Sequence, residues 1–136
     1  MTGHQSKVTP LRVAVRLVQA LLALLYVGTG LFKLMKPVAT LAGMWPWAGE
    51  LPGLVRATGI IDLLGGVGML LPTLTRIRPR LVVWAALGLA ALQVGAITFH
   101  LVRGEATNTP FNFALLALAL FVWWGQRKLL ATDSEA

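Results

Sequence analysis

Four long runs of apolar residues occupy most of the 136-residue chain. A helix needs about 20 residues to cross the roughly 30 Å of hydrocarbon in a bilayer. The runs approach this length at residues 13–34, 54–72, 81–102 and 110–126. The second run is the most polar, because it contains Arg56, Asp62 and four glycines. We therefore expect an all-α integral membrane four-helix bundle that forms a single domain over residues 1–136.

The composition excludes several other classes of protein. Hydrophobic residues make up 57% of the chain and charged residues only 12%, and a soluble domain of this size does not bury that much apolar surface. The absence of cysteine excludes disulfides, iron-sulfur clusters and dithiol redox mechanisms. The net charge of +7 does not indicate nucleic-acid binding, because the cations stand at the ends of the apolar runs.

The distribution of cations predicts how the chain crosses the membrane. Eight Lys and Arg residues fall on the side of the two termini, and four fall on the opposite side. The positive-inside rule then places both termini in the cytoplasm and predicts a multi-pass protein of the cytoplasmic (inner) membrane, with the bilayer as its solvent. A basic stretch before an apolar run is also typical of a signal peptide. No A-x-A-like cleavage site follows the first run, however, and the run continues into Lys33.

Polar residues inside the predicted spans fall into two layers. Lys33, His100 and Asn112 each lie within about one turn of the outer end of their helices. Tyr26 and Gln93 precede Lys33 and His100 by seven residues, which is nearly two turns, and so lie deeper on the same helix faces. Ionisable side chains are costly in hydrocarbon, so those in these layers are candidates for a functional site.

The depth of Asp62 depends on where its helix begins. If the helix begins at Pro52, Asp62 lies roughly 13 to 15 Å deep, level with Tyr26. If Arg56 marks the interface, Asp62 comes within reach of Lys33. We favour this second arrangement, because an unpaired buried carboxylate is costly.

Each of these residues also has a purely structural interpretation. Lys33 and His100 are placed where snorkelling anchors occur, and Asp62 is placed where a structural ion pair would fasten two helices. Gln93 and Asn112 are typical of hydrogen bonds between helices, and Tyr26 is typical of core packing. The glycine cluster 65–68 predicts close packing against another helix or a second copy of the chain, and therefore a homo-oligomer remains open.

Familiar catalytic constellations are missing from the chain. The only serines, Ser6 and Ser134, lie near the termini, which excludes a Ser-His-Asp set. The two histidines fall on opposite sides of the predicted membrane, which argues against bis-histidine haem ligation. A metal site formed by Asp62, His100 and Glu105 lacks any spacing signature, so we predict no metal.

Several short motifs, taken in order, resemble the DoxX and DoxX-like membrane proteins. The motifs are Gly30-Leu31-Phe32-Lys33-Leu34, Gly59-Ile60-Ile61-Asp62-Leu63-Leu64-Gly65-Gly66 with Leu70-Leu71-Pro72 after it, His100-Leu101-Val102-Arg103-Gly104-Glu105, and Asn112. The resemblance covers nearly the whole chain outside the tails. It implies a four-helix bundle in the cytoplasmic membrane, associated in some members with thiosulfate:quinone oxidoreductase or oxidative-stress complexes. The chain departs from the family pattern by having Asp62 where members often carry Glu.

Two functions fit these residues. In the first, the chain is a redox-associated subunit, with a quinone or similar lipid-soluble molecule bound in the outer half and electrons exchanged with a partner protein. The predicted proton-exchanging (catalytic) residues are Asp62 and His100, and the predicted ligand-binding residues are Lys33, Glu105, Asn112, Gln93 and Tyr26.

In the second function, the chain is a non-catalytic scaffold whose polar layer fastens the helices. The tryptophan pair in Met44-Trp45-Pro46-Trp47 then docks a partner or lies at the membrane interface. An open cavity lined by Lys33, Asp62 and His100 favours binding, and tight pairing without space favours the scaffold. A small transporter is a more distant alternative, because the chain has few spans.

Overall fold

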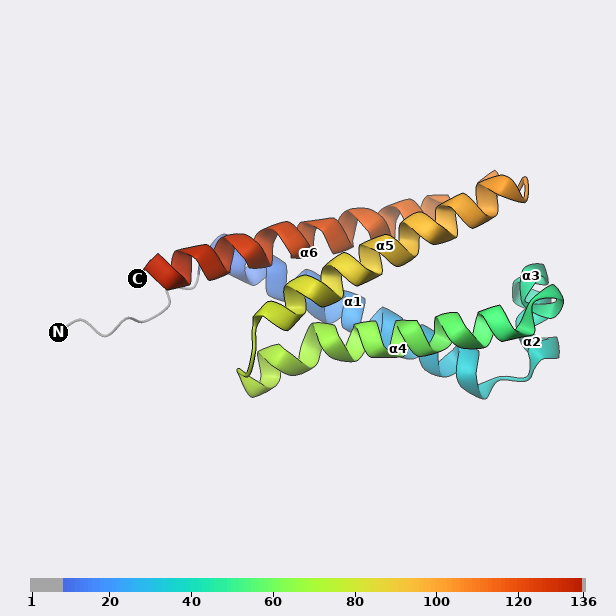
Figure 1. Cartoon of the computed structure of the whole chain (residues 1–136), viewed down its shortest axis with the longest axis horizontal. Coiled ribbons are helices and arrows are strands. Elements are labelled where there is room, and N and C mark those ends of the chain that lie inside the picture. The colour runs from blue at the N-terminus through green and yellow to red at the C-terminus, as the bar shows by residue number, and fades with distance from the viewer. Residues whose placement is uncertain (1–8, 136) are drawn as a thin grey trace.

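The computed structural model is a bundle of four long helices with two short helices at one end (Figure 1). It describes residues 9–135, and side chains as far as residue 133. Ser6 lies outside this part, as do His4, one of the two histidines, and Lys7, one of the cations counted on the side of the termini. The helices are α1 (Pro10–Met35), α2 (Val38–Met44), α3 (Pro46–Glu50), α4 (Pro52–Thr75), α5 (Arg80–Val102) and α6 (Pro110–Glu135), with a 3₁₀ turn η1 (Ala106–Asn108) before α6. The described chain contains no strand.

All four predicted spans are confirmed as helices, each long and apolar enough to cross a membrane. Proline marks where three of them begin: Pro10, Pro52 and Pro110 stand at the first helical position, where the missing N–H costs no hydrogen bond. Thr9 caps α1, because its hydroxyl accepts a hydrogen bond from the Arg12 backbone N–H at 3.2 Å. The protein is thus a membrane-type helical bundle.

The predicted and observed helix starts differ by at most three residues, and the ends of α4 and α6 lie beyond the predicted ones. Helix α6 continues to Glu135, well past residue 126, because Arg127 and Lys128 end the apolar run without breaking the helix. Helix α4 continues to Thr75 through Pro72, which stands within its last turn. The next residue, Arg76, caps the end of α4 with a left-handed backbone (φ 56°), a conformation that glycine often supplies at helix ends.

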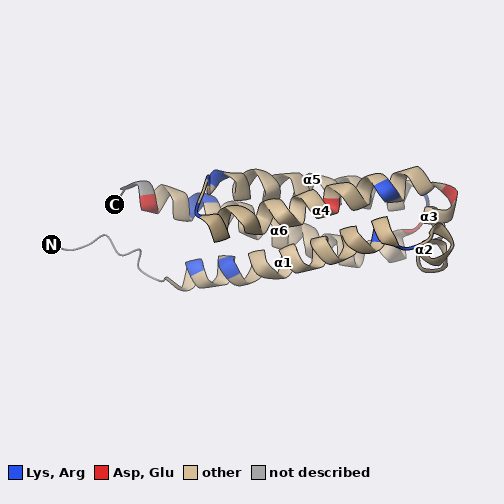
Figure 2. Ribbon diagram, turned by 90° about the horizontal axis from the view of Figure 1, so that it is seen from below, with Lys and Arg blue, Asp and Glu red and all other residues tan. Residues whose placement is uncertain are grey.

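The chain runs up and down the bundle, so that both described ends lie together (Figure 1). We call this the terminal end, and the opposite end, which carries α2 and α3, the distal end. Helix α1 packs along α4 and α5 packs along α6, while contacts of α4 with α5 and of α1 with α6 join the two pairs. Lys, Arg, Asp and Glu gather toward the two ends, and the middle is mostly uncharged (Figure 2).

Helices α1 and α4 approach each other at backbone distance. A Cβ atom on Gly30 would lie 2.8 Å from the carbonyl oxygen of Gly59, and one on Gly66 would lie 2.9 Å from the backbone nitrogen of Val27. Such contacts are shorter than a Cβ tolerates, so glycine is required for this separation of the helices. Close packing by the α4 glycines, predicted from the sequence, is therefore confirmed within one chain.

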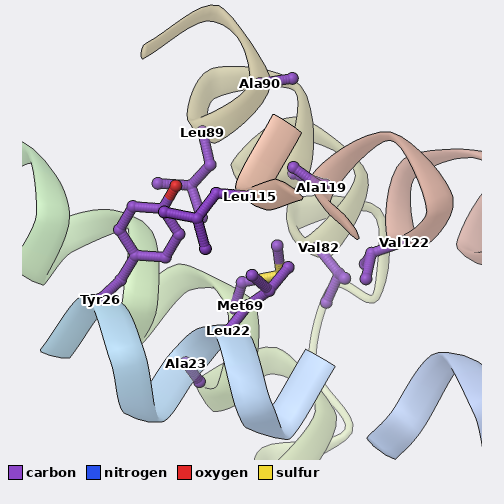
Figure 3. Close-up of a cluster of buried hydrophobic side chains, with 11 residues drawn as sticks. Leu22, Ala23, Tyr26, Met69, Val82, Leu89, Ala90, Leu115, Ala119 and Val122 are labelled. Atoms are coloured by element: carbon purple, nitrogen blue, oxygen red, sulfur yellow. The ribbon is translucent and has the colours of Figure 1, made fainter. Parts of the chain in front are cut away.

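The apolar core lies between the helix pairs in the middle and terminal half of the bundle. Figure 3 shows side chains from all four long helices meeting there, with Tyr26 on α1 facing Leu89 and Leu115. The buried members of this core are Leu22, Ala23, Tyr26, Met69, Val82, Ala86, Leu89, Ala90, Leu115, Ala119 and Val122. A smaller cluster of Leu41, Ala48 and Val55 holds α2 and α3 against the start of α4.

A buried polar network closes the terminal half of the bundle. Gln19 on α1 donates hydrogen bonds to the Met69 carbonyl and to the Thr73 hydroxyl (2.6 Å) on α4. Arg16 donates to Gln19 at 2.8 Å and to Gln126 on α6 at 2.9 Å. The network joins α1, α4 and α6 in the terminal half, and it is separate from the polar residues of the distal half.

Candidate functional site

A cavity of about 610 Å³ lies in the distal half, between the four long helices. This volume falls within the usual range for small-molecule sites, roughly 300 to 1,000 Å³. Most of its wall is apolar, and polar side chains from α1, α4, α5 and α6 project into the same space. The predicted site residues that line it are Tyr26, Lys33, Asp62, Gln93, His100 and Asn112.

Lys33 and Asp62 form an ion pair across the contact between α1 and α4. The Lys33 Nζ lies 2.8 Å from Asp62 Oδ2 and 3.4 Å from the Thr58 hydroxyl. The side chains are almost buried, with 13% of Lys33 and 4% of Asp62 exposed. A helical side chain leans toward the N-terminus of its helix, which directs Lys33 away from the distal surface. The ammonium therefore reaches inward to the carboxylate, and does not snorkel outward.

Both sequence-based expectations for Asp62 are partly correct. Helix α4 begins at Pro52, as the first arrangement required, yet Asp62 still pairs with Lys33, as the second required. Arg56 fixes the position of α4 along α1. Its guanidinium donates hydrogen bonds to the carbonyl oxygens of Lys33 and of Lys36 (2.9 Å) at the end of α1. These carbonyls have no partner further along the helix, so Arg56 caps α1. Sequence reasoning treated Arg56 only as an interface marker and missed this role.

Tyr26 and Gln93 meet at the deeper side of the cavity. The Gln93 Nε2 donates a hydrogen bond of 2.5 Å to the Tyr26 hydroxyl oxygen, which confirms Gln93 as a partner between helices. Tyr26 accepts in this bond, so its own O–H proton remains for another acceptor. The Oε1 atom of Gln93 is buried and has no hydrogen-bond partner among the described residues. An unpaired buried amide oxygen is costly, so this pair offers one donor and one acceptor to a ligand.

His100 lines the cavity near the end of α5, and its ring is hydrogen-bonded to Glu105 outside the cavity. The His100 Nδ1 lies 2.7 Å from Glu105 Oε2, and Arg103 Nε donates to Glu105 Oε1 at 2.9 Å. The hydrogen bonds from His100 and Arg103 hold the pKa of the Glu105 carboxyl below its ordinary value. An ionised carboxylate only accepts hydrogen bonds, so Nδ1 carries the proton in this pair. Glu105 itself is not part of the cavity wall.

The short helices α2 and α3 bring two tryptophans into the cavity wall. Trp45 and Trp47 stack with ring centroids 6.5 Å apart, and they link Phe32 of α1 (6.1 Å) to Phe99 of α5 (5.6 Å). The ammonium of Lys33 lies 5.9 Å from the Trp45 ring centroid. Sequence reasoning assigned these tryptophans to docking or to the interface. The structure places both of them in the cavity wall, a role that sequence reasoning missed.

Asn112 on α6 is the last of the predicted residues that line the cavity. Asn112 lines the cavity from the first turn of α6, and its side chain makes no hydrogen bond within the described part of the chain. No group of three or more His, Asp or Glu residues suited to a metal occurs in residues 9–135. The arrangement therefore offers hydrogen-bond donors, a histidine and an ion pair inside an aromatic and aliphatic cavity, which suits an apolar molecule with a few polar oxygens.

Comparison with known proteins gives one match. The sequence model of the DoxX-like family matches residues 17–122, a range that contains every cavity-lining residue named above. No curated protein and no solved structure matches the chain significantly. The match covers well over half of the chain, and the four apolar helices agree with a membrane protein. The chain therefore belongs to the DoxX-like family.

Proposed function

We propose that the protein binds a quinone, or a similar lipid-soluble molecule with polar oxygens, in the distal cavity, and that it acts as a redox-associated membrane subunit. The observation that carries this proposal is the open cavity beside the Lys33–Asp62 ion pair, with His100 in the same wall. A polar layer that served only to fasten helices would leave no such space. The unpaired Oε1 of Gln93 and the unbonded Asn112 side chain support a bound molecule further.

Each predicted site residue has a role in this proposal. Lys33 and the Tyr26 hydroxyl donate hydrogen bonds to quinone oxygens, and Asn112 and Gln93 add polar contacts. His100 and Asp62 exchange protons with the bound molecule, since reduction and oxidation of a quinone consume and release protons. Glu105 acts through His100, by holding the ring and its Nδ1 proton. The quinone itself supplies the electron chemistry.

The electrons must come from or pass to another redox centre. Nothing in the sequence predicts haem, an iron-sulfur cluster or a disulfide, so we assign the second centre to a partner protein. The proposal places the termini in the cytoplasm and the cavity in the outer half of the cytoplasmic membrane, because the cations number eight on the terminal side and four on the other. Homo-oligomers are compatible with this arrangement.

A non-catalytic scaffold is the second candidate function, and one observation favours it. The Lys33–Asp62 pair is closed at 2.8 Å and is backed by the Thr58 hydroxyl, so it already fastens α1 to α4 without a ligand. In a scaffold, the α2–α3 segment with its tryptophans would meet the partner protein. The two candidates differ in whether a small molecule occupies the cavity.

The test is mass spectrometry of the small molecules that co-purify with the protein in mild detergent. The variants are Lys33→Met, Asp62→Asn and the control Lys36→Met, which removes an exposed cation three residues from Lys33 that does not line the cavity. Circular dichroism first establishes that each variant is folded. We expect a quinone or related redox-active lipid with the wild type and with Lys36→Met, and its loss from the two cavity variants. No redox-active molecule with any form of the protein would contradict the proposal and favour the scaffold.

A further inference from the structure

The wall of the cavity is incomplete on the side between α4 and α5. Among its lining residues, Leu54 and Ile61 on α4 are 39% and 46% exposed, although both face the cavity as well. Opposite them, Gly95 on α5 is exposed, and a Cβ atom built there would meet nothing within 4 Å. Figure 1 shows the ribbons of α4 and α5 close together near the turn that joins them and separating toward the distal end.

The distal end of the cavity, by contrast, is covered. The α2–α3 segment lies across it, and Trp45 and Trp47 contribute to the cavity wall. The segment is held to α5 by the edge-to-face contact of Trp47 with Phe99 and by an ion pair of 2.7 Å between Glu50 and Arg103. A molecule that reaches the cavity from the distal surface must displace these contacts. One that arrives between α4 and α5 passes the exposed residues Leu54, Ile61 and Gly95, all of which are apolar.

We propose that the cavity opens sideways into the bilayer between α4 and α5, and that its ligand is an amphiphile with a long hydrocarbon chain that leaves the cavity past Gly95. The head of the molecule lies among Lys33, Tyr26 and His100, and the chain lies against Gly95 and Ile61. This inference rests on the proposed function and narrows it to a quinone that carries an alkyl or isoprenoid chain. Helices α4 and α5 are both long and apolar enough to span a membrane, so an opening between them faces lipid chains and not water.

The glycine at position 95 sets the width of this opening. It lies in the middle of a regular helix, where alanine or leucine is intrinsically more favourable, and no neighbouring atom within 4 Å requires its small size. Glycines in the α1–α4 contact differ, because backbone atoms lie where their Cβ would be. The space beside Gly95 is therefore open room at the edge of the cavity, as a passing hydrocarbon chain requires.

The chain offers a matched pair of variants to test this. Gly88 lies seven residues before Gly95 on α5, nearly two turns away on the same face, and its Cβ position also meets nothing within 4 Å. Only Gly95 lines the cavity. Gly95→Leu and Gly88→Leu make the same chemical change in open space, and both replace glycine by a better helix former. We therefore expect both variants to fold.

The measurement is equilibrium binding to the protein in lipid nanodiscs, followed by quenching of tryptophan fluorescence. Trp45 and Trp47 lie at the cavity, and a quinone there quenches them. Two probes are compared: a benzoquinone with a ten-carbon tail and the same ring without the tail. For the tailed probe we expect Gly95→Leu to raise Kd about tenfold or more, the size of effect that a local steric misfit produces. Gly88→Leu should leave its Kd unchanged, and neither variant should change the Kd of the tailless ring.

The other outcomes separate the two proposals. If the wild type binds the tailed probe and Gly95→Leu binds it equally well, the sideways opening is wrong while the cavity function stands. The opening is also wrong if Gly95→Leu weakens both probes to the same extent, because leucine then fills the site of the ring. It is wrong again if the wild type binds both probes equally tightly. If the wild type binds neither probe, the proposed function fails and this inference fails with it.

Discussion

The ammonium of Lys33 and the carboxylate of Asp62 lie 2.8 Å apart in the interface between α1 and α4, with 4% of the Asp62 side chain exposed. The two residues are 29 positions apart in the chain, and glycines bring their helices close enough for the contact. The pair also forms part of the cavity wall. The ion pair therefore joins α1 to α4 and is also exposed to any molecule bound in the cavity.

Removal of one partner from this pair should destabilise the protein. Lys33→Met leaves a buried carboxylate without its cation, and Asp62→Asn leaves a buried ammonium without its anion. Each single substitution is expected to lower the free energy of unfolding by about 3 kcal/mol, and the double substitution by clearly less than the sum. Chemical unfolding in detergent, with Lys36→Met as control, measures these values. Additive effects of the two substitutions would show that the pair contributes no interaction energy.

The contact between α1 and α4 should not tolerate a methyl group. In Gly30→Ala the new Cβ would lie 2.8 Å from backbone atoms of Gly59 and Leu63, which cannot move without shifting α4. We expect a loss of about 2 kcal/mol in the free energy of unfolding. Gly28→Ala, two residues earlier, is the matched control, because its Cβ meets nothing within 4 Å. This control should be neutral or slightly stabilising, since alanine favours helix; equal losses for both would contradict the close contact.

The four spans could be predicted because each depends on a local property of the sequence. Runs of apolar residues predicted all four helix starts to within three residues. The end of α6 could not be predicted in this way, because Arg127 and Lys128 end the apolar run but remain compatible with a helix. Helices α2 and α3 are 7 and 5 residues long, and helices so short have too few turns to show a periodic pattern.

Several residues of the candidate site could be identified from the sequence, but the geometry of the cavity could not. The cost of polar groups in hydrocarbon identified Lys33, Asp62 and His100 as candidates, and all three line one cavity. The cavity itself depends on how far the two helix pairs separate, which no local pattern encodes. The role of Arg56 was missed for a similar reason, since the carbonyls it caps belong to a different helix.

The carboxyl of Glu105 should affect stability in a pH-dependent manner. Its hydrogen bonds from His100 and Arg103 lower its pKa in the folded protein. The ordinary glutamate pKa is about 4.3, so these contacts contribute stability fully above that pH and lose it as the pH falls through the lowered folded value. Thermal unfolding of the wild type and of Glu105→Gln from pH 7 to pH 3 should show a difference in Tm that narrows at the acid end. A difference that widens toward acid pH would contradict the lowered pKa.

The proposed orientation can be tested by labelling single cysteines, because the natural sequence contains none. Thr132→Cys lies near the terminal end and Ala39→Cys lies at the distal end, and both positions are exposed. With a membrane-impermeant maleimide applied to intact spheroplasts, Ala39→Cys should react and Thr132→Cys should react only after lysis. The opposite pattern would place the cavity in the cytoplasmic half of the membrane.

The most direct test of the account is to locate a bound quinone by photocrosslinking. A tailed benzoquinone that carries an aryl azide is added to membranes containing the protein, activated by light and mapped by mass spectrometry of peptides. We expect crosslinks in residues 25–33 of α1 and 92–100 of α5, removed by an excess of the unmodified quinone. Crosslinks spread over the lipid-facing surfaces of all four long helices, and unaffected by the competitor, would contradict binding in the distal cavity.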